Sequence, residues 1–200
     1  GESMKQLLIL SGKGGTGKTT TAAALIAFSK GRAFADCDVD APNLHLVMDF
    51  KNEPEQSTFL GAQKAWIDTA KCIGCGKCQS SCRFDSIVIN GDVCAVNELS
   101  CEGCAVCTVV CPTGAVAMKD DVAGDMMLYK DERVFSTAKL KMGRGNSGKL
   151  VTAVKKSLVE HANADFGIID GSPGIGCPVI ASISGVNIVL IVAEPSLSGI

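Results

Sequence analysis

The chain has 200 residues, of which 46% are hydrophobic and 20% are charged, and its formal net charge is −2. This composition is typical of a globular protein with a sizeable core and excludes an intrinsically disordered chain. A charge so close to neutral gives no field that would attract nucleic acid, so we expect no nucleic-acid partner. The longest apolar stretch, Ala22 to Phe28, is far shorter than the roughly 20 residues of a membrane span, so we expect none.

The first elements of the chain predict a parallel α/β fold. Lys5 to Leu10 is a short apolar run typical of a buried strand, and a glycine-rich turn follows it. Thr19 to Ser29 has helical character, and Arg32 to Ala35 favours a second strand that leads into an acidic loop. The order of strand, loop, helix and strand is that of a parallel sheet with crossover helices.

The composition changes in the middle of the chain. Residues 62–118 are rich in Cys and Gly and contain short β-like pieces such as Ser86 to Asn90, so we interpret them as a small inserted α+β domain. The flanking segments, 4–61 and 119–200, would then form one domain with a mostly parallel sheet and helices on both faces. Because no helix closes this pattern before Ile200, we expect the domain to continue past that residue.

Regular α/β signals return after the insert. Val134 to Met142 favours a strand, and Gly148 to His161 favours a helix. The expected apolar side of that helix consists of Leu150, Val154, Leu158 and Val159. Two apolar runs, Phe166 to Asp170 and Val186 to Ala193, suit strands that are covered on both faces of the sheet.

The cysteines form two identical runs. Nine of the eleven lie between Cys72 and Cys111 inclusive, and only Cys37 and Cys177 lie outside. No segment with the features of a signal peptide begins the chain, so we expect a reducing, cytoplasmic location where cysteines bind metal rather than form disulfides. Each run has the spacing C-x2-C-x2-C-x3-C, which is known from bacterial iron–sulfur ligation. Its members are Cys72, Cys75, Cys78 and Cys82, and then Cys101, Cys104, Cys107 and Cys111 followed by Pro112.

This segment resembles the bacterial ferredoxins that hold two 4Fe–4S clusters. The resemblance implies that the fourth cysteine of each run serves the other cluster. Cluster one would use Cys72, Cys75, Cys78 and Cys111, and cluster two would use Cys82, Cys101, Cys104 and Cys107. Arg83 replaces the usual proline after the first run, and Cys94 is interpreted as a small buried residue. The alternative is zinc, whose ligands usually come as separated C-x2-C pairs.

A phosphate-binding loop follows the first strand. The sequence GKGGTGKT satisfies G-x4-G-K-T between a strand and a helix, which is the context that the motif requires. Backbone N–H groups of such a loop surround phosphate oxygens, and the helix N-terminus adds its positive end. The nucleotide-binding residues expected here are Gly12, Lys13, Gly14, Gly15, Thr16, Gly17, Lys18, Thr19 and Thr20. Lys18 would reach the β- and γ-phosphates, and Thr19 would bind magnesium.

Lys13, the other lysine of this loop, makes the motif more specific. The sequence SGKGGTGKTT resembles the deviant Walker A loop of the MinD/ParA/Mrp ATPases. That resemblance implies that Lys13 reaches across a dimer to the partner's nucleotide, so that hydrolysis depends on an ATP-dependent homodimer. It also implies that Asp38, in an acidic switch I segment, positions or activates the attacking water. Asp36, Asp40 and Asn43 are secondary candidates, because an acidic loop is often only solvated.

A second switch segment follows the strand that ends at Asp170. The sequence DGSPG resembles the Walker B and switch II pattern, usually D-x-P-P-G, with Ser172 in place of the first proline. Asp170 would hold magnesium together with Thr19.

Cys37 and Cys177 lie beside the two switches. Related ATPases carry a cysteine there that bridges the dimer through a further cluster, but Cys177 lacks the second cysteine of C-x-x-C, so we interpret both thiols as buried and inert.

The combination predicts an ATPase whose cofactors are ATP, magnesium and two 4Fe–4S clusters. The first hypothesis is ATP-gated electron transfer to a redox partner protein. The second is an iron–sulfur carrier or assembly ATPase that hands clusters to an apo iron–sulfur acceptor. The third is a positioning ATPase that uses its clusters to sense redox state. The residues that contact the adenine base are expected beyond Ile200.

Overall fold

The computed structural model describes residues 4–195, which form two compact units. The larger, here called the sheet unit, consists of residues 4–59, 124–141 and 146–195. The smaller, here called the cysteine unit, consists of residues 60–123 and 142–145. Within residues 4–195, no helix is long and apolar enough to cross a membrane.

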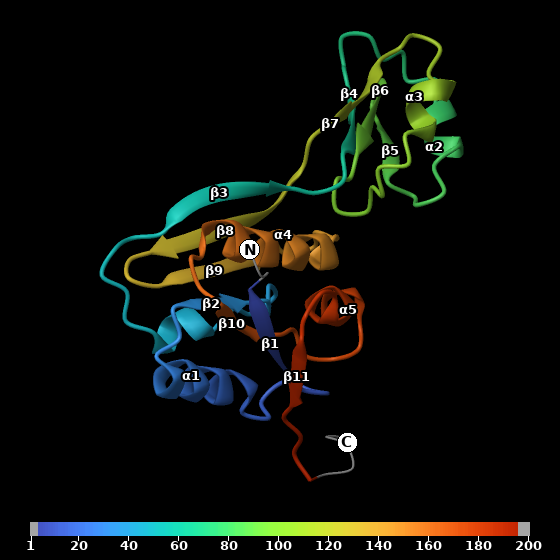
Figure 1. The fold of residues 1–200 in the computed structure, drawn as a ribbon. Helices are drawn as coiled ribbons and strands as arrows, with labels where there is room; N and C mark the ends of the chain where they lie inside the picture. Colours follow the sequence, from blue (N-terminus) through green and yellow to red (C-terminus); the bar gives the residue numbers. More distant parts are fainter. Residues whose placement is uncertain (1–3, 196–200) are drawn as a thin grey trace. The chain divides into compact units, whose positions relative to one another are not determined.

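The sheet unit is built on a seven-stranded sheet, whose strands are labelled in Figure 1. Five neighbouring strands are parallel, and the next one is antiparallel to its neighbour, so the sheet is mostly parallel as predicted. In spatial order the strands are β11 (Ile188–Ile191), β1 (Lys5–Leu10), β10 (Phe166–Asp170), β2 (Ala33–Asp36), β9 (Val134–Leu140), β8 (Val122–Lys130) and β3 (Glu55–Leu60).

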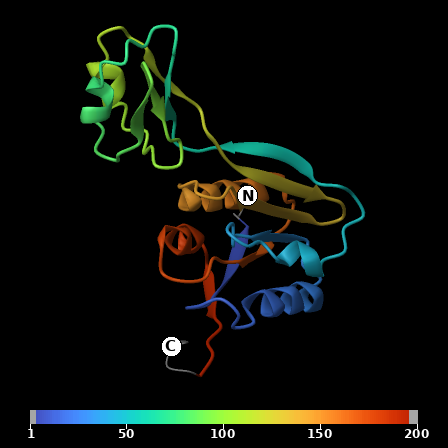
Figure 2. The same cartoon turned by 180° about the vertical axis from the view of Figure 1, so that it is seen from behind.

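Helices cover both faces of this sheet, because successive strand residues point to opposite sides. Ile9 of β1 packs with Ala22 and Ile26 of α1 (Lys18–Ser29). The neighbouring Leu8 and Leu10 pack in a separate cluster with α4 (Ser147–His161). The short helix α5 (Cys177–Ile183) packs against α4, and a 3-10 turn, η1 (Leu44–Val47), follows β2. Figure 2 shows α1 and α4 from behind.

Two expectations about burial are wrong. The apolar stripe of α4 contains Val151, which is fully buried, while Val159 is 47% exposed. The reason is geometric, since Leu150, Val151, Val154 and Leu158 share one face of a 3.6-residue helix and Val159 lies one step further round. The predicted strand over Val186 to Ala193 is shorter, and among the described residues it lies at the sheet edge with its side chains exposed rather than covered.

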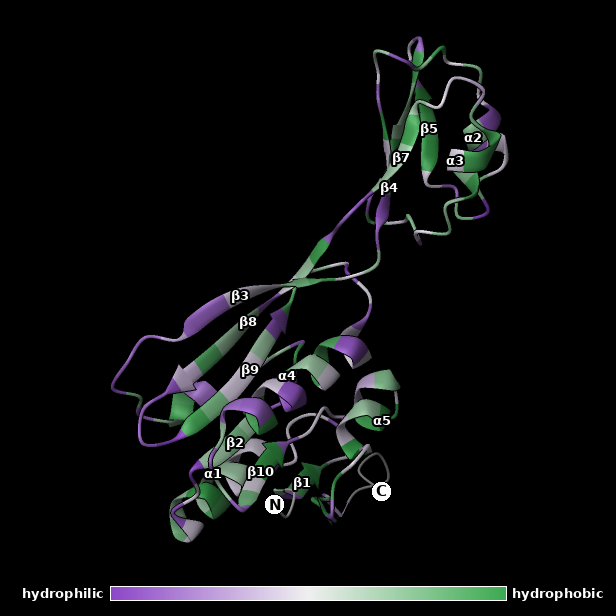
Figure 3. Ribbon diagram, turned by 45° about the horizontal axis from the view of Figure 1, so that its top comes forward, coloured by the Kyte–Doolittle hydropathy of each residue, from purple (hydrophilic) through white to green (hydrophobic). Residues whose placement is uncertain are grey.

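The cysteine unit is an internal repeat. Adding 29 to the residue numbers takes Cys72 to Cys101, and takes each strand or helix of the first half onto one of the second half. The first half contains β4 (Lys64–Ile67), α2 (Lys77–Ser80) and β5 (Ile87–Asn90), and the second contains β6 (Val93–Val96), α3 (Val106–Val110) and β7 (Val116–Lys119). β4 pairs with β7 and β5 pairs with β6, both antiparallel. These strands are largely hydrophobic in Figure 3.

Two glycines show how closely the cysteine loops approach the strands. Gly74 and its repeat equivalent Gly103 have φ angles of 61° and 70°. A Cβ atom at either position would clash with a backbone carbonyl, that of Asp92 or that of Gln63. The glycines between the ligands therefore allow the cysteine loops to lie against the segments that precede β6 and β4.

Candidate functional site

The phosphate-binding loop joins β1 to α1. Its Gly15 and Gly17 have φ angles of 79° and 89°, which side chains rarely adopt. Gly17 caps α1 with no side-chain hydrogen bond, and the first turn of α1 contains no acidic residue. The N–H groups at this helix end therefore remain suited to an anion. The Thr16 hydroxyl is buried with no hydrogen-bond partner among the described residues, which also fits a loop shaped for a polar ligand.

Lys18, Thr19 and Asp170 lie together at the ends of α1 and β10. The Lys18 Nζ lies 2.5 Å from Asp170 Oδ1, and the Thr19 hydroxyl donates to Asp170 Oδ2 at 2.7 Å. Lys18 is 6% exposed and Asp170 is fully buried. Three residues that the sequence assigned to phosphate and magnesium are thus brought within hydrogen-bond distance across 151 positions of chain.

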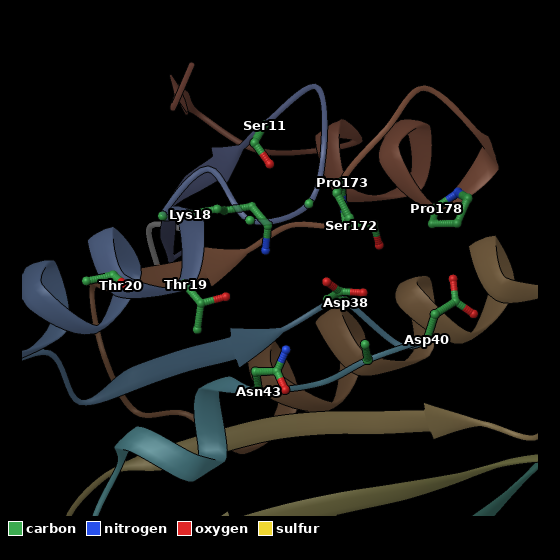
Figure 4. Close-up of a pocket in the computed structure, with 14 residues that line it drawn as sticks. Ser11, Lys18, Thr19, Thr20, Asp38, Asp40, Asn43, Ser172, Pro173 and Pro178 are labelled. Atoms are coloured by element: carbon green, nitrogen blue, oxygen red, sulfur yellow. The ribbon is translucent and has the colours of Figure 1, made fainter. Parts of the chain in front are cut away.

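A cavity of about 580 Å³ lies in front of this group. Lys18, Thr19 and Asp38 point into the same space in Figure 4. Burial raises the pKa of Asp38, and the charge of Lys18 partly offsets this effect. A carboxylate with a raised pKa beside a phosphate site is a suitable proton acceptor. The cavity is also lined by Ser11, Asp40, Ala41, Asn43, Pro173 and Pro178.

Asp36 has a different position from Asp38. Its carboxylate accepts backbone N–H bonds from Asp38, Asn43 and Leu44, each at 2.9 Å. The side chain is fully buried, and burial raises its pKa to about 6, with the nearby Asp170 adding to the rise. Asp36 therefore shapes the switch I loop from inside the fold, whereas Asp40 and Asn43 line the cavity.

Lys13 forms an ion pair within its own chain. Its Nζ lies 2.6 Å from the Glu194 carboxylate, which follows β11. Both side chains are partly exposed, so the pair is accessible to solvent and is worth roughly 0–1 kcal/mol.

A hydrogen bond joins the two switch segments. The Ser172 hydroxyl donates to the carbonyl oxygen of Cys37 at 2.5 Å, and Ser172 is 5% exposed. Burial raises the pKa of the fully buried Cys37 thiol, in keeping with an inert residue. Cys177 differs, because it is exposed at the start of α5, so the expectation of a buried thiol there is wrong.

The eight motif cysteines gather in two groups. Two cavities of the cysteine unit are each lined by three cysteines of one run and the fourth cysteine of the other, which are the two sets expected for cluster one and cluster two. The first cavity contains Cys72, Cys75, Cys78 and Cys111, and the second contains Cys82, Cys101, Cys104 and Cys107. Among the described residues, no three His, Cys, Asp or Glu side chains are close enough to hold a single metal ion.

Backbone N–H groups point at several of these sulfurs. Cys94 N–H donates to Cys72 Sγ at 3.4 Å, and Ala65 N–H donates to Cys101 Sγ at 3.5 Å. The bond from Cys94 is the main cause of a lowered Cys72 pKa. N–H bonds to sulfur stabilise thiolates and adjust the potentials of the clusters that they hold.

These contacts, and the partners of Lys13 and Ser172, were not predicted from the sequence. The sequence contains one signal for the N–H bonds to sulfur, because the 29-residue repeat places Ala65 and Cys94 at equivalent positions before the two cysteine runs. Another was Pro178, since proline near a helix start is common and could have predicted α5.

Part of the cysteine unit matches a known family. The family model of the 4Fe–4S dicluster domain matches residues 65–118. The uncharacterized protein MJ0578 of Methanocaldococcus jannaschii is 34% identical over 202 residues, which cover 98% of this chain and 69% of MJ0578. The chain belongs to the family of MJ0578.

Other relatives come from the same organism. The uncharacterized protein MJ0579 is 28% identical over 98% of this chain and 73% of its own length. The uncharacterized ATP-binding protein MJ0547 is 43% identical over 68 residues, which cover 32% of this chain and 26% of MJ0547. The dicluster match agrees with the predicted 4Fe–4S segment, and the mostly parallel sheet confirms the predicted fold class.

Some solved structures are also similar to the chain. The ATP complex of Cyanothece McdA(D38A) is 21% identical over 100% of this chain, with a TM-score of 0.48. The cell division ATPase MinD of Pyrococcus furiosus is 18% identical over 98% of this chain, with a TM-score of 0.44. The chain spans 60% and 61% of the lengths of these two proteins.

Proposed function

We propose that this protein binds and hydrolyses ATP as a homodimer, and that the nucleotide state gates electron transfer through two 4Fe–4S clusters. The observation that carries the proposal is the presence of two kinds of site in one chain. One is a phosphate-binding cavity with a buried Lys18–Asp170 pair, and the other is a pair of four-cysteine groups.

The residues of the cavity fit a nucleotide with magnesium. The loop from Gly12 to Thr20 would hold the phosphates, and Thr19 and Asp170 supply the oxygen ligands that magnesium prefers. Lys18 belongs to this loop and pairs with Asp170, so it can exchange this partner for phosphate oxygens. Bound magnesium would neutralise charge on the phosphates.

Hydrolysis would need residues from both switch segments and from a second copy of the chain. Asp38 faces the cavity and would orient or deprotonate the attacking water. Lys13 would leave Glu194 and stabilise charge at the partner's nucleotide, at little energetic cost because the pair is partly exposed. This arrangement makes dimerisation a condition for hydrolysis.

The cysteine groups fit the crossed ligation of two clusters. Cluster one would be held by the group that contains Cys111, and cluster two by the group that contains Cys82. When bound, the clusters supply one-electron redox chemistry. The eleven thiols are all free, which suits a reducing cytoplasmic location. We keep 62–118 as the proposed limits of the cluster domain, and 4–61 and 119–200 as those of the ATPase domain.

The cluster domain lies between the two switches in sequence. Asp38 precedes it and Asp170 follows it, and the Ser172–Cys37 hydrogen bond links the switches themselves. A γ-phosphate that orders both switches would therefore act on the chain segments that enter and leave the cluster domain.

Chemical analysis of anaerobically prepared protein tests the composition that the proposal requires. We expect eight iron and eight acid-labile sulfide per chain, together with magnesium-dependent ATP hydrolysis whose specific activity rises with protein concentration. Stoichiometric zinc without sulfide would overturn the redox part. Hydrolysis that is independent of protein concentration, or absent, would overturn the dimer part.

A second candidate function is the delivery of clusters to an apo iron–sulfur protein. The observation that favours it is the exposure of Cys75 and Cys104, one cysteine of each group. Incubation of 57Fe-labelled protein with an apo-acceptor separates the two functions. Delivery predicts that the label moves to the acceptor, whereas gated electron transfer predicts that the acceptor is reduced while the label stays.

A further inference from the structure

Cys94 is the cysteine of the cysteine unit that neither ligand group includes. It lies on β6, it is 2% exposed, and it lines the same cavity as the ligands proposed for cluster one. Its backbone N–H donates to Cys72 Sγ at 3.4 Å, and its side chain packs in one buried cluster with Cys72 and Cys78. A thiol group therefore lines the cavity that the four cysteines of this group also line.

The internal repeat places an alanine at the matching position. Ala65 precedes Cys94 by 29 residues, lines the cavity proposed for cluster two, and donates its backbone N–H to Cys101. The backbone hydrogen bond is thus common to both halves, at 3.4 Å and 3.5 Å. What differs is the side chain, which is a hydrogen-bond donor in one half and a methyl group in the other.

We propose that Cys94 is a positioning residue that makes the two clusters inequivalent, by donating a hydrogen bond from its thiol to the ligand sulfurs of cluster one. Reduction adds negative charge to a cluster and its thiolates, so a donor beside the sulfurs stabilises the reduced state and raises the potential. The inference rests on the proposed function, and it adds which of the two clusters holds an electron more readily. An electron would be held at cluster one more readily than it would be with an alanine at position 94.

The chain supplies its own controls for this test. Cys94→Ala removes the thiol and keeps the backbone N–H, so it isolates the side chain. Cys94→Ser keeps a donor of similar size, and Ala65→Cys introduces a thiol at the repeat-equivalent position. The full chain, prepared anaerobically, is assayed for iron and sulfide and then titrated with a reductant while the EPR signals of the reduced clusters are followed.

We expect eight iron and eight sulfide in every variant. In Cys94→Ala one of the two potentials shifts to a more negative value and the other does not move, and Cys94→Ser recovers most of the shift. In Ala65→Cys the other potential shifts to a more positive value. A structural role of Cys94 in packing alone would leave the potentials unchanged in all three variants.

Three results would overturn the inference alone, with the proposed function intact. One is full cluster content with unchanged potentials in Cys94→Ala. Another is loss of half the iron in that variant, which would make Cys94 a ligand rather than a donor. The third is a shift of the same potential by Ala65→Cys and Cys94→Ala. Wild-type protein with fewer than two clusters would instead overturn the ligand assignment, and both proposals with it.

Discussion

Lys18 and Asp170 form a buried ion pair at the centre of the phosphate site. Lys18→Ala removes the cation that would bind the phosphates and leaves the Asp170 carboxylate without this partner. A charge-assisted hydrogen bond contributes about 1.5–3 kcal/mol, so we expect ATP to bind about tenfold to 150-fold more weakly. Isothermal titration calorimetry with MgATP measures the change.

The control for this substitution is Lys156→Ala. Lys156 lies on the solvent side of α4 and is 72% exposed in an ion pair with Glu160. Its removal should leave ATP affinity within a factor of two. Equal affinities of wild type and Lys18→Ala would mean that this loop does not bind the phosphates.

Asp36 gives the sheet unit a dependence on pH. Its pKa is about 6 in the folded chain and close to 3.8 when unfolded, so the folded state holds the proton more tightly. This contribution to stability is fully present below pH 3.8 and is lost as the pH rises through about 6. Between pH 5 and pH 7 we expect the free energy of unfolding to fall by about 1 kcal/mol from this group.

Urea unfolding at several pH values, followed by circular dichroism, measures this loss. Asp36→Asn should be less stable at every pH, because an amide nitrogen cannot accept the backbone N–H bonds. Its free energy of unfolding should nevertheless lack the part of the pH dependence that comes from Asp36. A wild-type slope that persists unchanged in Asp36→Asn would assign the titration to another group.

At the scale of elements, the two switch segments are joined by the Ser172–Cys37 hydrogen bond. Ser172→Ala removes a buried bond that is worth about 1 kcal/mol and leaves the Cys37 carbonyl without this donor. We expect backbone amides of residues 37–41 to exchange about fivefold faster in hydrogen-exchange mass spectrometry. Ser29→Ala, which removes an exposed bond within α1, is the matched control. No change at residues 37–41 would show that the link does not hold the switch.

The crossed cysteine runs make a second prediction at this scale. Cys111→Ser should disturb the same cluster as Cys72→Ser, although Cys111 belongs to the other run, because both line one cavity. Cys82→Ser should disturb the same cluster as Cys101→Ser. EPR spectra of the four reduced variants should therefore form two matching pairs. If Cys111→Ser instead matched Cys101→Ser, each run would serve a single cluster.

The sequence predicted those features that depend on local spacing. The glycine loop and the cysteine runs are such features, since their chemistry follows from residues a few positions apart. Contacts between residues that are distant in sequence were not predicted. Glu194 meets Lys13, and Ala65 meets Cys101, only because the strands pair in a particular register. Neither register can be read from periodicity alone.

Burial was harder to predict than the elements themselves. The helix α4 was expected, but Val159 was assigned to its buried face in place of Val151. Val151 shares that face with Leu150, Val154 and Leu158, whereas Val159 lies outside it. The strands β3 and β8, which flank the cysteine unit in sequence, were missed. Their polar residues, such as Glu55 and Asp125, give no continuous apolar run.

For the whole molecule, the central claim is that the nucleotide controls the clusters. The reduced protein is mixed anaerobically with a one-electron acceptor in a stopped-flow instrument, with MgATP, with MgADP or with no nucleotide. A typical coupling between two sites changes the binding affinity at one of them by about 5- to 150-fold. We expect MgATP to change the rate of acceptor reduction by at least about fivefold in wild type and to have no effect in Lys18→Ala. Equal rates under all three conditions in wild type would contradict the account.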